Sequence, residues 1–183
     1  SVGTGSTDTI TASDDPGDTL TCTATATDSD SGTDTASASA TVTNTDPVMG
    51  TVSVSPSTGQ VTDTLTCSAS PTDADGETPT ITYAWTNGSS SVGTGSTYTI
   101  TPSHNPGDTL PCTATATDSD SGTDTASASA TVTNTDPVMG TVSVAPSPRQ
   151  VTDTLTRSAS PTDADRETPT SILVRFHGNT QDG

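Results

Sequence analysis

Acidic turns are the segments of this sequence whose residue types and spacing best suit a chemical role. The string Asp-Ser-Asp-Ser-Gly-Thr-Asp occupies residues 28–34 and recurs at 118–124, and Asp-Ala-Asp-Gly-Glu occupies 73–77. Carboxylate oxygens are the hard ligands that Ca²⁺ takes in proteins, so these turns are candidate calcium sites. Their aspartates are Asp28, Asp30, Asp34, Asp73, Asp75, Asp118, Asp120 and Asp124.

Two observations limit the calcium interpretation. An EF-hand is excluded, because Gly32 comes one position early and Ser39 stands where the bidentate glutamate belongs. Asp, Gly and Ser are also the residues that solvated turns use without any ligand. The sequence therefore leaves two interpretations open, a calcium site and a solvated acidic turn, and calcium is the one cofactor that it suggests.

Groups suited to catalysis are few, and we expect no enzymatic activity. His104 stands where the other copy of the repeat has Asp14, and we expect a lone, exposed histidine without a chemical role. No serine lies in a Gly-x-Ser-x-Gly elbow with a plausible base. The string Gly93-Thr-Gly95 is too short for a dinucleotide-binding loop, and a predicted strand follows it.

Glycosylation is better supported than catalysis. Asn87-Gly-Ser89 is an N-glycosylation sequon in a predicted hairpin turn. Outward Thr and Ser side chains offer many hydroxyls for O-linked sugar. We therefore expect covalent glycans at Asn87 and on the outer strand faces. Threonine is also β-branched and suits an extended backbone by itself, and both explanations can hold together.

Composition and charge bound the partners of the chain. Its 183 residues include 4 Lys+Arg and 22 Asp+Glu, a formal charge of -18, and only 26% are hydrophobic. This excess of acid argues against nucleic acid as a partner. No apolar stretch approaches the ~20 residues that span a bilayer, so we expect no membrane span. Such compositions are ordinarily disordered, and only order along the sequence argues otherwise.

A tandem repeat supplies that order. Residues 1–80 align with 91–170 without a gap and differ at about 10 positions, so the period is about 90 residues. A half-period of about 45 residues shows in Asp-Thr-Leu-Thr-Cys and its variants, which begin at Asp18, Asp63, Asp108 and Asp153. Each repeat is therefore predicted to consist of two related β segments.

The string Asn-Thr-Asp-Pro, at 44–47 and 134–137, predicts the linkers between domains. Proline forces the residue before it out of the helical region, and the apolar alternation breaks there. The predicted units are the back half of a domain at 1–46, a complete domain at 47–136, and the front half of the next at 137–183, which diverges after 170.

Apolar residues in the complete domain alternate with Thr and Ser at a period of two, which predicts strands with one buried face. Short strands separated by Gly, Pro, Asn and Asp turns indicate an all-β fold of two-sheet β-sandwiches. Trp85 has two interpretations, a core residue or an exposed platform for stacking sugars. Its alternation with Tyr83 and Ile81 favours the core.

The strings Asp63-Thr-Leu-Thr-Cys-Ser-Ala-Ser, Thr72-Asp-Ala-Asp-Gly-Glu and Thr82-Tyr-Ala-Trp-Thr-Asn-Gly carry a resemblance to known families. The chain resembles bacterial extracellular tandem repeats of the immunoglobulin-like and polycystic-kidney-disease-like type. It is also similar to the glycosylated tandem β-motif fibres found outside environmental microbes, and residues 73–77 resemble the calcium turns of cadherin-like modules. The likeness covers nearly everything except the last dozen or so residues. It departs from antibody-type domains at Leu110, where a tyrosine is usual.

The resemblance also implies a disulfide. Cys67, Trp85 and Cys112 follow the order in which immunoglobulin-like sandwiches place an inter-sheet disulfide against a core tryptophan, which predicts a Cys67–Cys112 bridge. Cys22 is then unpaired within the chain, and Arg157 occupies the position that matches Cys67 in the last copy. Disulfides persist outside the cytosol, so we expect an extracellular or cell-surface protein.

The function that the resemblance implies is structural. We expect a non-enzymatic extracellular fibre or stalk of immunoglobulin-like repeats that associates with itself head to tail and carries glycans. The front half at 137–183 is also expected to pair with the back half at 1–46 of a neighbouring chain, although Arg157 opposite Cys22 argues against a covalent joint. The alternative is a calcium-dependent adhesin or carbohydrate-binding protein in which the array is a spacer.

Overall fold

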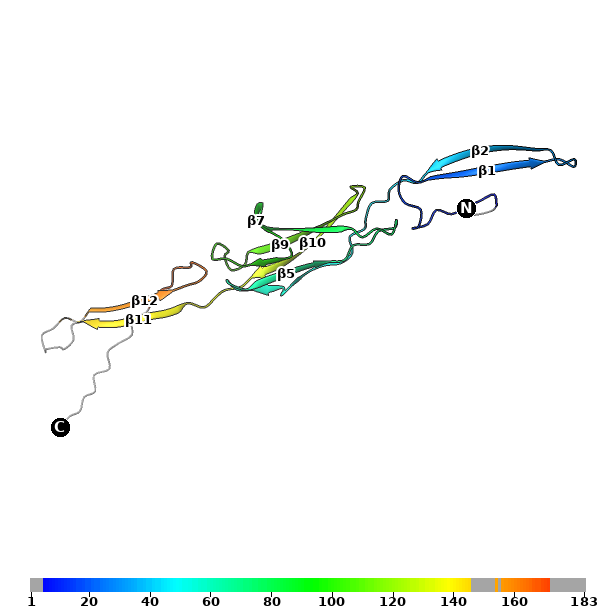
Figure 1. Cartoon of the computed structure of the whole chain (residues 1–183). Coiled ribbons are helices and arrows are strands. Elements are labelled where there is room, and N and C mark those ends of the chain that lie inside the picture. The colour runs from blue at the N-terminus through cyan, green and yellow to red at the C-terminus, as the bar shows by residue number, and fades with distance from the viewer. Residues whose placement is uncertain (1–4, 146–153, 155, 172–183) are drawn as a thin grey trace.

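The chain is all-β throughout the residues that the computed structural model describes, 5–145, 154 and 156–171. The described residues form four sheets and no helix (Figure 1). Within them, accordingly, no helix is long and apolar enough to cross a membrane. The predicted all-β fold is confirmed.

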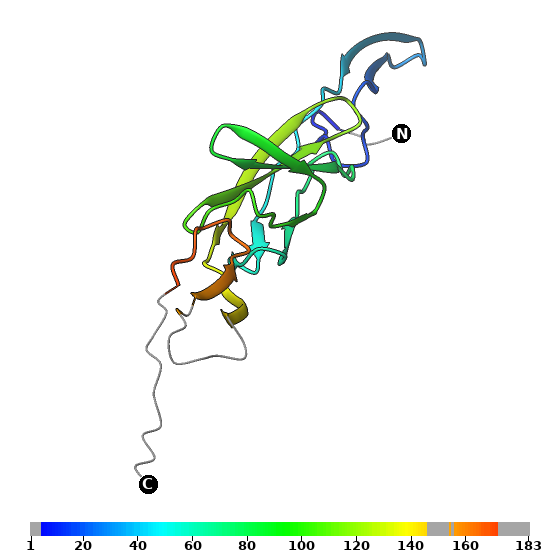
Figure 2. The same cartoon turned by 90° about the vertical axis from the view of Figure 1, so that its left-hand side faces the viewer.

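A sandwich of two sheets lies in the middle of the molecule (Figures 1 and 2). One sheet has the order β4-β10-β9-β6-β7 and the other β3-β5-β8. Only the β4–β10 pair is parallel among these strands. Their bounds are β3 (Val52–Ser55), β4 (Thr58–Gly59), β5 (Thr64–Ala69), β6 (Thr80–Asn87), β7 (Ser90–Thr94), β8 (Thr97–Thr99), β9 (Thr109–Thr117) and β10 (Thr123–Val132). The predicted β-sandwich is confirmed.

Alternation of side chains explains how a sequence with few apolar residues forms this core. Along β10 every Thr and Ser is exposed, while the residues between them are half-buried or buried. The alternation does not reveal β4 and β7, because β4 has 2 residues and β7 is a mostly polar Ser-Ser-Val-Gly-Thr segment. Ala and Val therefore line the inside, and hydroxyls cover the outside.

The core is fastened by a disulfide and filled by a tryptophan. Cys67 of β5 is bonded to Cys112 of β9, so the bridge joins the two sheets as predicted. Trp85 is fully buried, which confirms its core interpretation, and its Nε1 donates to the carbonyl oxygen of Gly95 at 2.9 Å. The indole stacks on the ring of Tyr98 with centroids 5.7 Å apart. These contacts compensate for a core made largely of small side chains.

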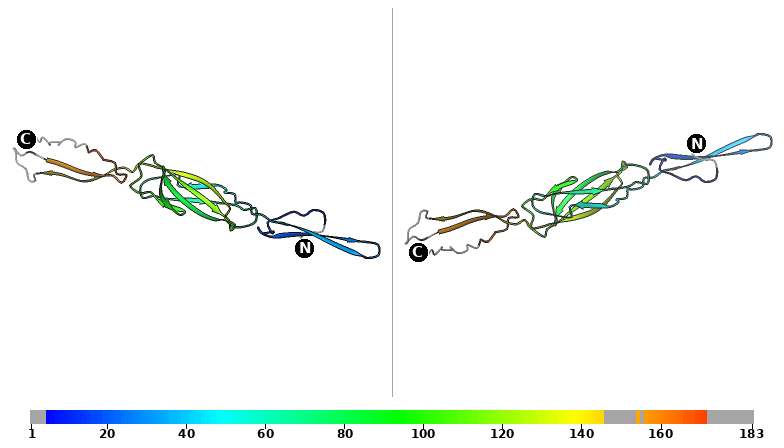
Figure 3. Two further views of the ribbon diagram at one scale, coloured as in Figure 1. Left: turned by 90° about the horizontal axis from the view of Figure 1, so that it is seen from above. Right: turned by 90° about the horizontal axis from the view of Figure 1, so that it is seen from below.

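Two isolated hairpins continue the chain beyond the sandwich, one on each side, in an elongated row (Figure 3). The first consists of β1 (Thr19–Thr27) and β2 (Thr33–Thr41), and the second of β11 (Val138–Ala145) and β12 (Thr156–Thr162). They lie in the segments that the repeat assigns to half-domains. Residues 172–183, which include most of the predicted divergent tail, lie outside the described residues.

Candidate metal centre at the junction before the central sandwich

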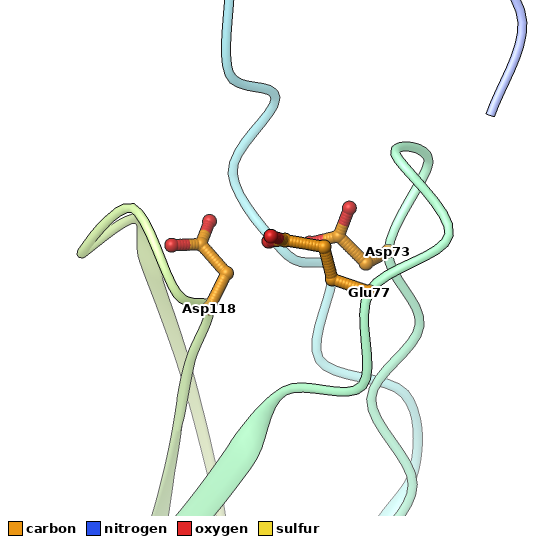
Figure 4. Close-up of side chains that lie close together, drawn as sticks. All are labelled: Asp73, Glu77 and Asp118. Carbon is orange, nitrogen blue, oxygen red and sulfur yellow. The ribbon is translucent and has the colours of Figure 1, made fainter. Parts of the chain in front are cut away.

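Three carboxylates meet at the end of the sandwich that the linker from β2 enters. One oxygen each from Asp73, Glu77 and Asp118 lies within 4.8 Å of the other two. Figure 4 shows these side chains extending toward one another from two loops. In the described part of the chain, this is the one group of three or more His, Cys, Asp or Glu side chains at such spacing. The structure thus brings together two of the predicted aspartates, Asp73 and Asp118.

Hydrogen bonds within each loop fix the aspartates in place. In the loop after β9, Oδ1 of Asp118 accepts from the backbone N–H groups of Asp120 at 2.9 Å and Gly122 at 2.7 Å. In the loop between β5 and β6, Oδ1 of Asp73 accepts from the N–H of Asp75 at 2.8 Å. Aspartate favours such turns, because its short side chain reaches backbone N–H groups a few residues ahead. Each aspartate therefore keeps Oδ2 for contacts outside its own turn.

The linker from the preceding unit is bound to both loops. Nδ2 of Asn44 donates to Oδ2 of Asp118 at 3.0 Å. The N–H of Thr45 donates to Oδ2 of Asp75 at 2.7 Å. The Asn-Thr-Asp-Pro string, which predicts only a linker from the sequence, thus also supplies polar groups to the site.

Gly122 lets the linker lie this close to the turn. A Cβ at this position would collide with the Asp118 carboxylate and would lie only 2.5 Å from Oδ1 of Asp46 and 2.9 Å from Nδ2 of Asn44. The site therefore combines groups from three segments, the linker at 44–46 and the loops at 73–77 and 118–122.

Three oxygens at this junction are buried without a hydrogen-bond donor: Oδ1 of Asn44, Oδ2 of Asp73 and Oε2 of Glu77. The other oxygen of Glu77 accepts from the hydroxyl of Ser119. A buried acceptor without a partner costs about 1–3 kcal/mol. A cation that binds oxygen would give these acceptors a partner.

The charge of the group favours the same conclusion. Hydrogen bonds from Asn44 and from the backbone of its own turn lower the pKa of the Asp118 carboxyl, although it is only 7% exposed. Asp118 is therefore ionised at neutral pH beside two further carboxylates. All four cationic residues of the chain are arginines at position 149 or later. Strand β12, which carries Arg157, lies at the opposite end of the sandwich (Figure 1).

The donor set suits Ca²⁺ better than other common metals. Every available donor is a carboxylate or amide oxygen, whereas zinc prefers nitrogen and sulfur. Ca²⁺ takes about 6–8 oxygens in flexible geometries, while Mg²⁺ demands a near-ideal octahedron and keeps several waters. Carboxylates from two separate loops, with the linker bound to one of them, provide the flexible arrangement.

The other predicted aspartates take different positions. Asp124 accepts the N–H of Met49 at 2.7 Å, and this hydrogen bond lowers the pKa of its carboxyl. Asp75 holds the linker, and the N–H of Asp120 is bonded within its own turn. The predicted aspartates of the first copy are exposed: Asp28 and Asp30 lie in the turn between β1 and β2, and Asp34 lies in β2.

The next linker repeats part of this junction. The N–H and hydroxyl of Thr135 donate to the two carboxylate oxygens of Asp165 at 2.5 and 3.0 Å, as Thr45 does to Asp75 through its N–H. Asp165 is 2% exposed, and its own N–H donates to Oδ1 of Asp163 at 2.8 Å. The attachment of linker to loop is therefore a property of the repeat.

His104 lies in the interior, so the expectation of an exposed histidine is wrong. The side chain is 2% exposed, and its Nε2 lies 2.6 Å from the hydroxyl oxygen of Tyr98. Its Nδ1 lies 3.1 Å from Nδ2 of Asn87 and 4.0 Å from Oδ2 of Asp108. The ring therefore fills space and joins polar groups beneath the β6–β7 hairpin.

The sequon asparagine belongs to the same network. Asn87 precedes the β6–β7 turn as predicted, and its Nδ2 donates to Oδ2 of Asp108 at 2.7 Å. Hydrogen bonds from the backbone of Asn105 and from Asn87 lower the pKa of the Asp108 carboxyl. An N-linked glycan replaces one hydrogen of this amide. Modification of Asn87 would therefore remove one of its contacts with Asp108 or His104.

No protein-family model matches the chain, and no curated protein matches it. The chemistry of the site is therefore inferred from its own geometry.

Proposed function

We propose that the chain is a segment of an extracellular, non-enzymatic fibre or stalk in which immunoglobulin-like β-sandwich repeats run head to tail and Ca²⁺ fixes the junctions. The observation that carries this proposal is the composition of the junction. Two loops of one unit bring three carboxylates together, the linker from the preceding unit donates a hydrogen bond to one of them, and three oxygens at the junction are buried without a donor.

The arrangement of the units supports an array. The hairpins and the sandwich follow one another in a row (Figure 3), and both linkers are held by a threonine-to-aspartate hydrogen bond. Each added repeat would then extend the row by a constant length. Interstrand hydrogen bonds and the Cys67–Cys112 bridge would resist extension within a unit.

Calcium would act on the joints rather than on the sandwich. Without a cation, the carboxylates of Asp73, Glu77 and Asp118 repel one another, so the linker is held mainly by its hydrogen bonds. With Ca²⁺ bound, the linker and both loops share one ion. We therefore expect chelation to loosen the angle between units while the disulfide-bonded core stays folded.

The direct test is cryo-electron microscopy of material secreted by cells that produce this sequence, with calcium and after chelation. The proposal predicts a straight fibre with one sandwich per repeat of about 90 residues, which becomes more curved after chelation. Isolated monomeric domains in both conditions would contradict the array. A fibre with the same curvature with calcium and after chelation would contradict only the role of the metal.

Two glycine variants make a matched control for the junction. Gly122→Ala places a Cβ against Asp118, Asp46 and Asn44, whereas Gly32→Ala meets only the Asp28 side chain of its own turn. Measured on this chain alone, Gly122→Ala should weaken calcium binding and Gly32→Ala should leave it unchanged. Equal effects of the two variants would show that the turn, not the linker, governs the joint.

We place the proposed glycans on exposed Thr and Ser hydroxyls, because Asn87 is engaged within the sandwich. Intact-mass measurement of the secreted protein tests this. A mass above 18.1 kDa that falls on release of O-linked sugar is the expected result. A bare chain, or sugar at Asn87 alone, would contradict it.

The carbohydrate-binding alternative loses its main candidate. Trp85 is fully buried and stacks on Tyr98, so it presents no face to a sugar. A calcium-dependent spacer would use the same junction, and it differs from a fibre only in what the ends of the array carry.

A further inference from the structure

The β1–β2 hairpin exposes an apolar face on which no second sheet packs in the described structure, although residues 5–8 line the groove along it. Alternate residues of both strands project to this face, and cross-strand pairing sets Cys22 opposite Ala38 and Ala24 opposite Ala36. These side chains are exposed, and Cys22 is a free thiol. An open groove runs along the face, with Leu20, Cys22 and Ala38 among its lining residues.

The central sandwich shows what covers this face when a unit is complete. Cys112 and Ala114, the counterparts of Cys22 and Ala24, are fully buried. Strands β3 and β5 pack over β10 and β9, and Cys67 of β5 is bonded to Cys112. Trp85 of β6 fills the space beside the bridge. The cover therefore comes from residues 47–94 of the same repeat.

We propose that the β1–β2 face binds the front half of another repeat, a segment with the sequence of residues 47–94, and that Cys22 forms a disulfide with the cysteine of that segment. This inference rests on the proposed array, because an array supplies such halves from adjoining or neighbouring chains. It is tested apart from calcium: the docking segment carries the acidic loop at 73–77, and a chelator keeps the metal out of the assay.

The covalent step is a thiol–disulfide exchange. The incoming cysteine arrives as a mixed disulfide with oxidised glutathione or a similar small disulfide. The Cys22 thiolate attacks the sulfur of the incoming cysteine, one S–S bond forms, the other breaks, and the small thiolate leaves with the electron pair. Docking would raise the local concentration of the two reacting groups, so the exchange should be faster than between free thiols.

A second copy of this chain is the competing occupant, through residues 137–171. Arg157 of β12 occupies the position that matches Cys67, so that half cannot complete the bridge. In the sandwich the Cys67 side chain is 2% exposed, so an arginine there would carry its charge into the core. The cysteine-bearing front half is therefore the favoured partner.

The docked unit would be weaker than the central one. Tyr98, which stacks on Trp85 and contacts His104, has Asp8 as its counterpart, and His104 has Asp14. The completed N-terminal unit would lack the stacked ring and the Tyr–His contact. The disulfide should therefore contribute a larger share of the stability of the N-terminal unit. For this reason the thiol–disulfide exchange at Cys22 is the appropriate measure of docking.

The test uses the full chain and a synthetic peptide of residues 47–94 whose cysteine is a mixed disulfide with 5-thio-2-nitrobenzoate, in the presence of a chelator. Release of the coloured thiolate measures the exchange with Cys22. We expect it to be about 100-fold faster than with a scrambled peptide that carries the same activated cysteine, because docking supplies effective concentration. Equal rates for the two peptides would overturn the proposal.

Three variants separate docking from simple reactivity. Leu20→Asp, on a hairpin that is already exposed, should reduce the rate to that of the scrambled peptide, and Cys22→Ser should abolish covalent capture. Thr25→Asp, on the opposite face of β1 and away from the residues that line the groove, should leave the rate unchanged. If Leu20→Asp and Thr25→Asp behave alike, the face does not bind the peptide. Sedimentation showing self-association through 137–171 that blocks the peptide would also overturn the choice of partner.

Discussion

Two hairpins of this molecule have almost the same sequence and different surroundings. Residues 19–41 and 109–131 differ only where Thr21 is replaced by Pro111. Both pair their strands in the same register along their whole length. The turns agree as well, since the N–H groups of Gly32 and Gly122 each donate to the aspartate four residues earlier at 2.7 Å.

Burial is what separates the two hairpins. Cys112, Ala114 and Ala116 are fully buried, whereas every residue of β1 except Leu20 is exposed. Strand pairing and turn geometry are thus set locally, and burial is set by partners distant in the sequence. The same division applies to the acidic turns, because Asp118 meets a linker and a second loop while Asp28 remains in solvent.

The largest expected effect comes from the disulfide. Removing it with Cys67→Ser and Cys112→Ser frees a loop that spans 45 residues, which should lower the free energy of unfolding of the sandwich by about 4 kcal/mol. Cys22→Ser should change it by about 0.5 kcal/mol or less, since Cys22 is exposed and unbonded. Urea unfolding followed by fluorescence of Trp85, the single tryptophan, measures both. If Cys22→Ser lowered the free energy of unfolding as much as removal of the disulfide does, the two hairpins would share one core.

A buried leucine should rank next. Leu110→Ala should destabilise the sandwich by about 3 kcal/mol, because it removes a fully buried side chain and leaves a cavity. Leu20 is the half-buried counterpart of Leu110 in the first hairpin, so Leu20→Ala should lower the free energy of unfolding by about 0.5 kcal/mol or less. The same unfolding curves test this. A large effect of Leu20→Ala would mean that the first hairpin is already covered in solution.

The buried histidine should have a smaller effect. His104→Ala leaves the Tyr98 hydroxyl and the Asn87 amide without one partner each, at a cost of about 2 kcal/mol. Asp14→Ala should cost about 0.5 kcal/mol or less, since the Asp14 carboxylate lies in an exposed turn. Near-ultraviolet circular dichroism of Tyr98 and Trp85 should change only in His104→Ala. An unchanged spectrum would contradict the network.

The smallest effect concerns pH. The folded-state pKa of Asp118 lies below its ordinary value of 3.8, so its contribution to stability is fully present above that pH and is lost as the pH falls through the folded pKa. Asp118→Asn should therefore be less stable than wild type near neutral pH, and the difference should shrink in acid. A constant difference between Asp118→Asn and wild type would contradict an ionised carboxylate.

Much of the fold could be predicted from the sequence, because it depends on local pattern. Alternation of apolar residues with Thr and Ser locates the longer strands, and the resemblance supplies the Cys67–Cys112 pair. The buried state of His104 could not be predicted from its own position, because its partner Tyr98 is 6 residues away on another element. The sequence did carry one signal of the contact: Tyr98 and His104 both stand where the first copy has an aspartate, Asp8 and Asp14.

The candidate metal centre could be predicted only in part, because the contact between its loops is not encoded locally. The composition of the loops indicates Asp73 and Asp118 as ligands, but proximity of the loops depends on the sandwich. Asn44 and Glu77 were missed among the candidate ligands because a linker and a turn explain them locally. Their counterparts Asn134 and Glu167 were the signal, since both copies keep these residues at the same offsets.

The most direct test of the account is a calcium titration of the full chain followed by backbone amide chemical shifts. We expect saturable shifts in 44–46, 73–77 and 118–122 and their loss in Asp118→Asn. The turn at 28–34, which has the same sequence as 118–124, should not shift. Equal shifts at 28–34 and 118–124 would contradict it, because they would show that Ca²⁺ only screens acidic turns and does not join the linker to the sandwich.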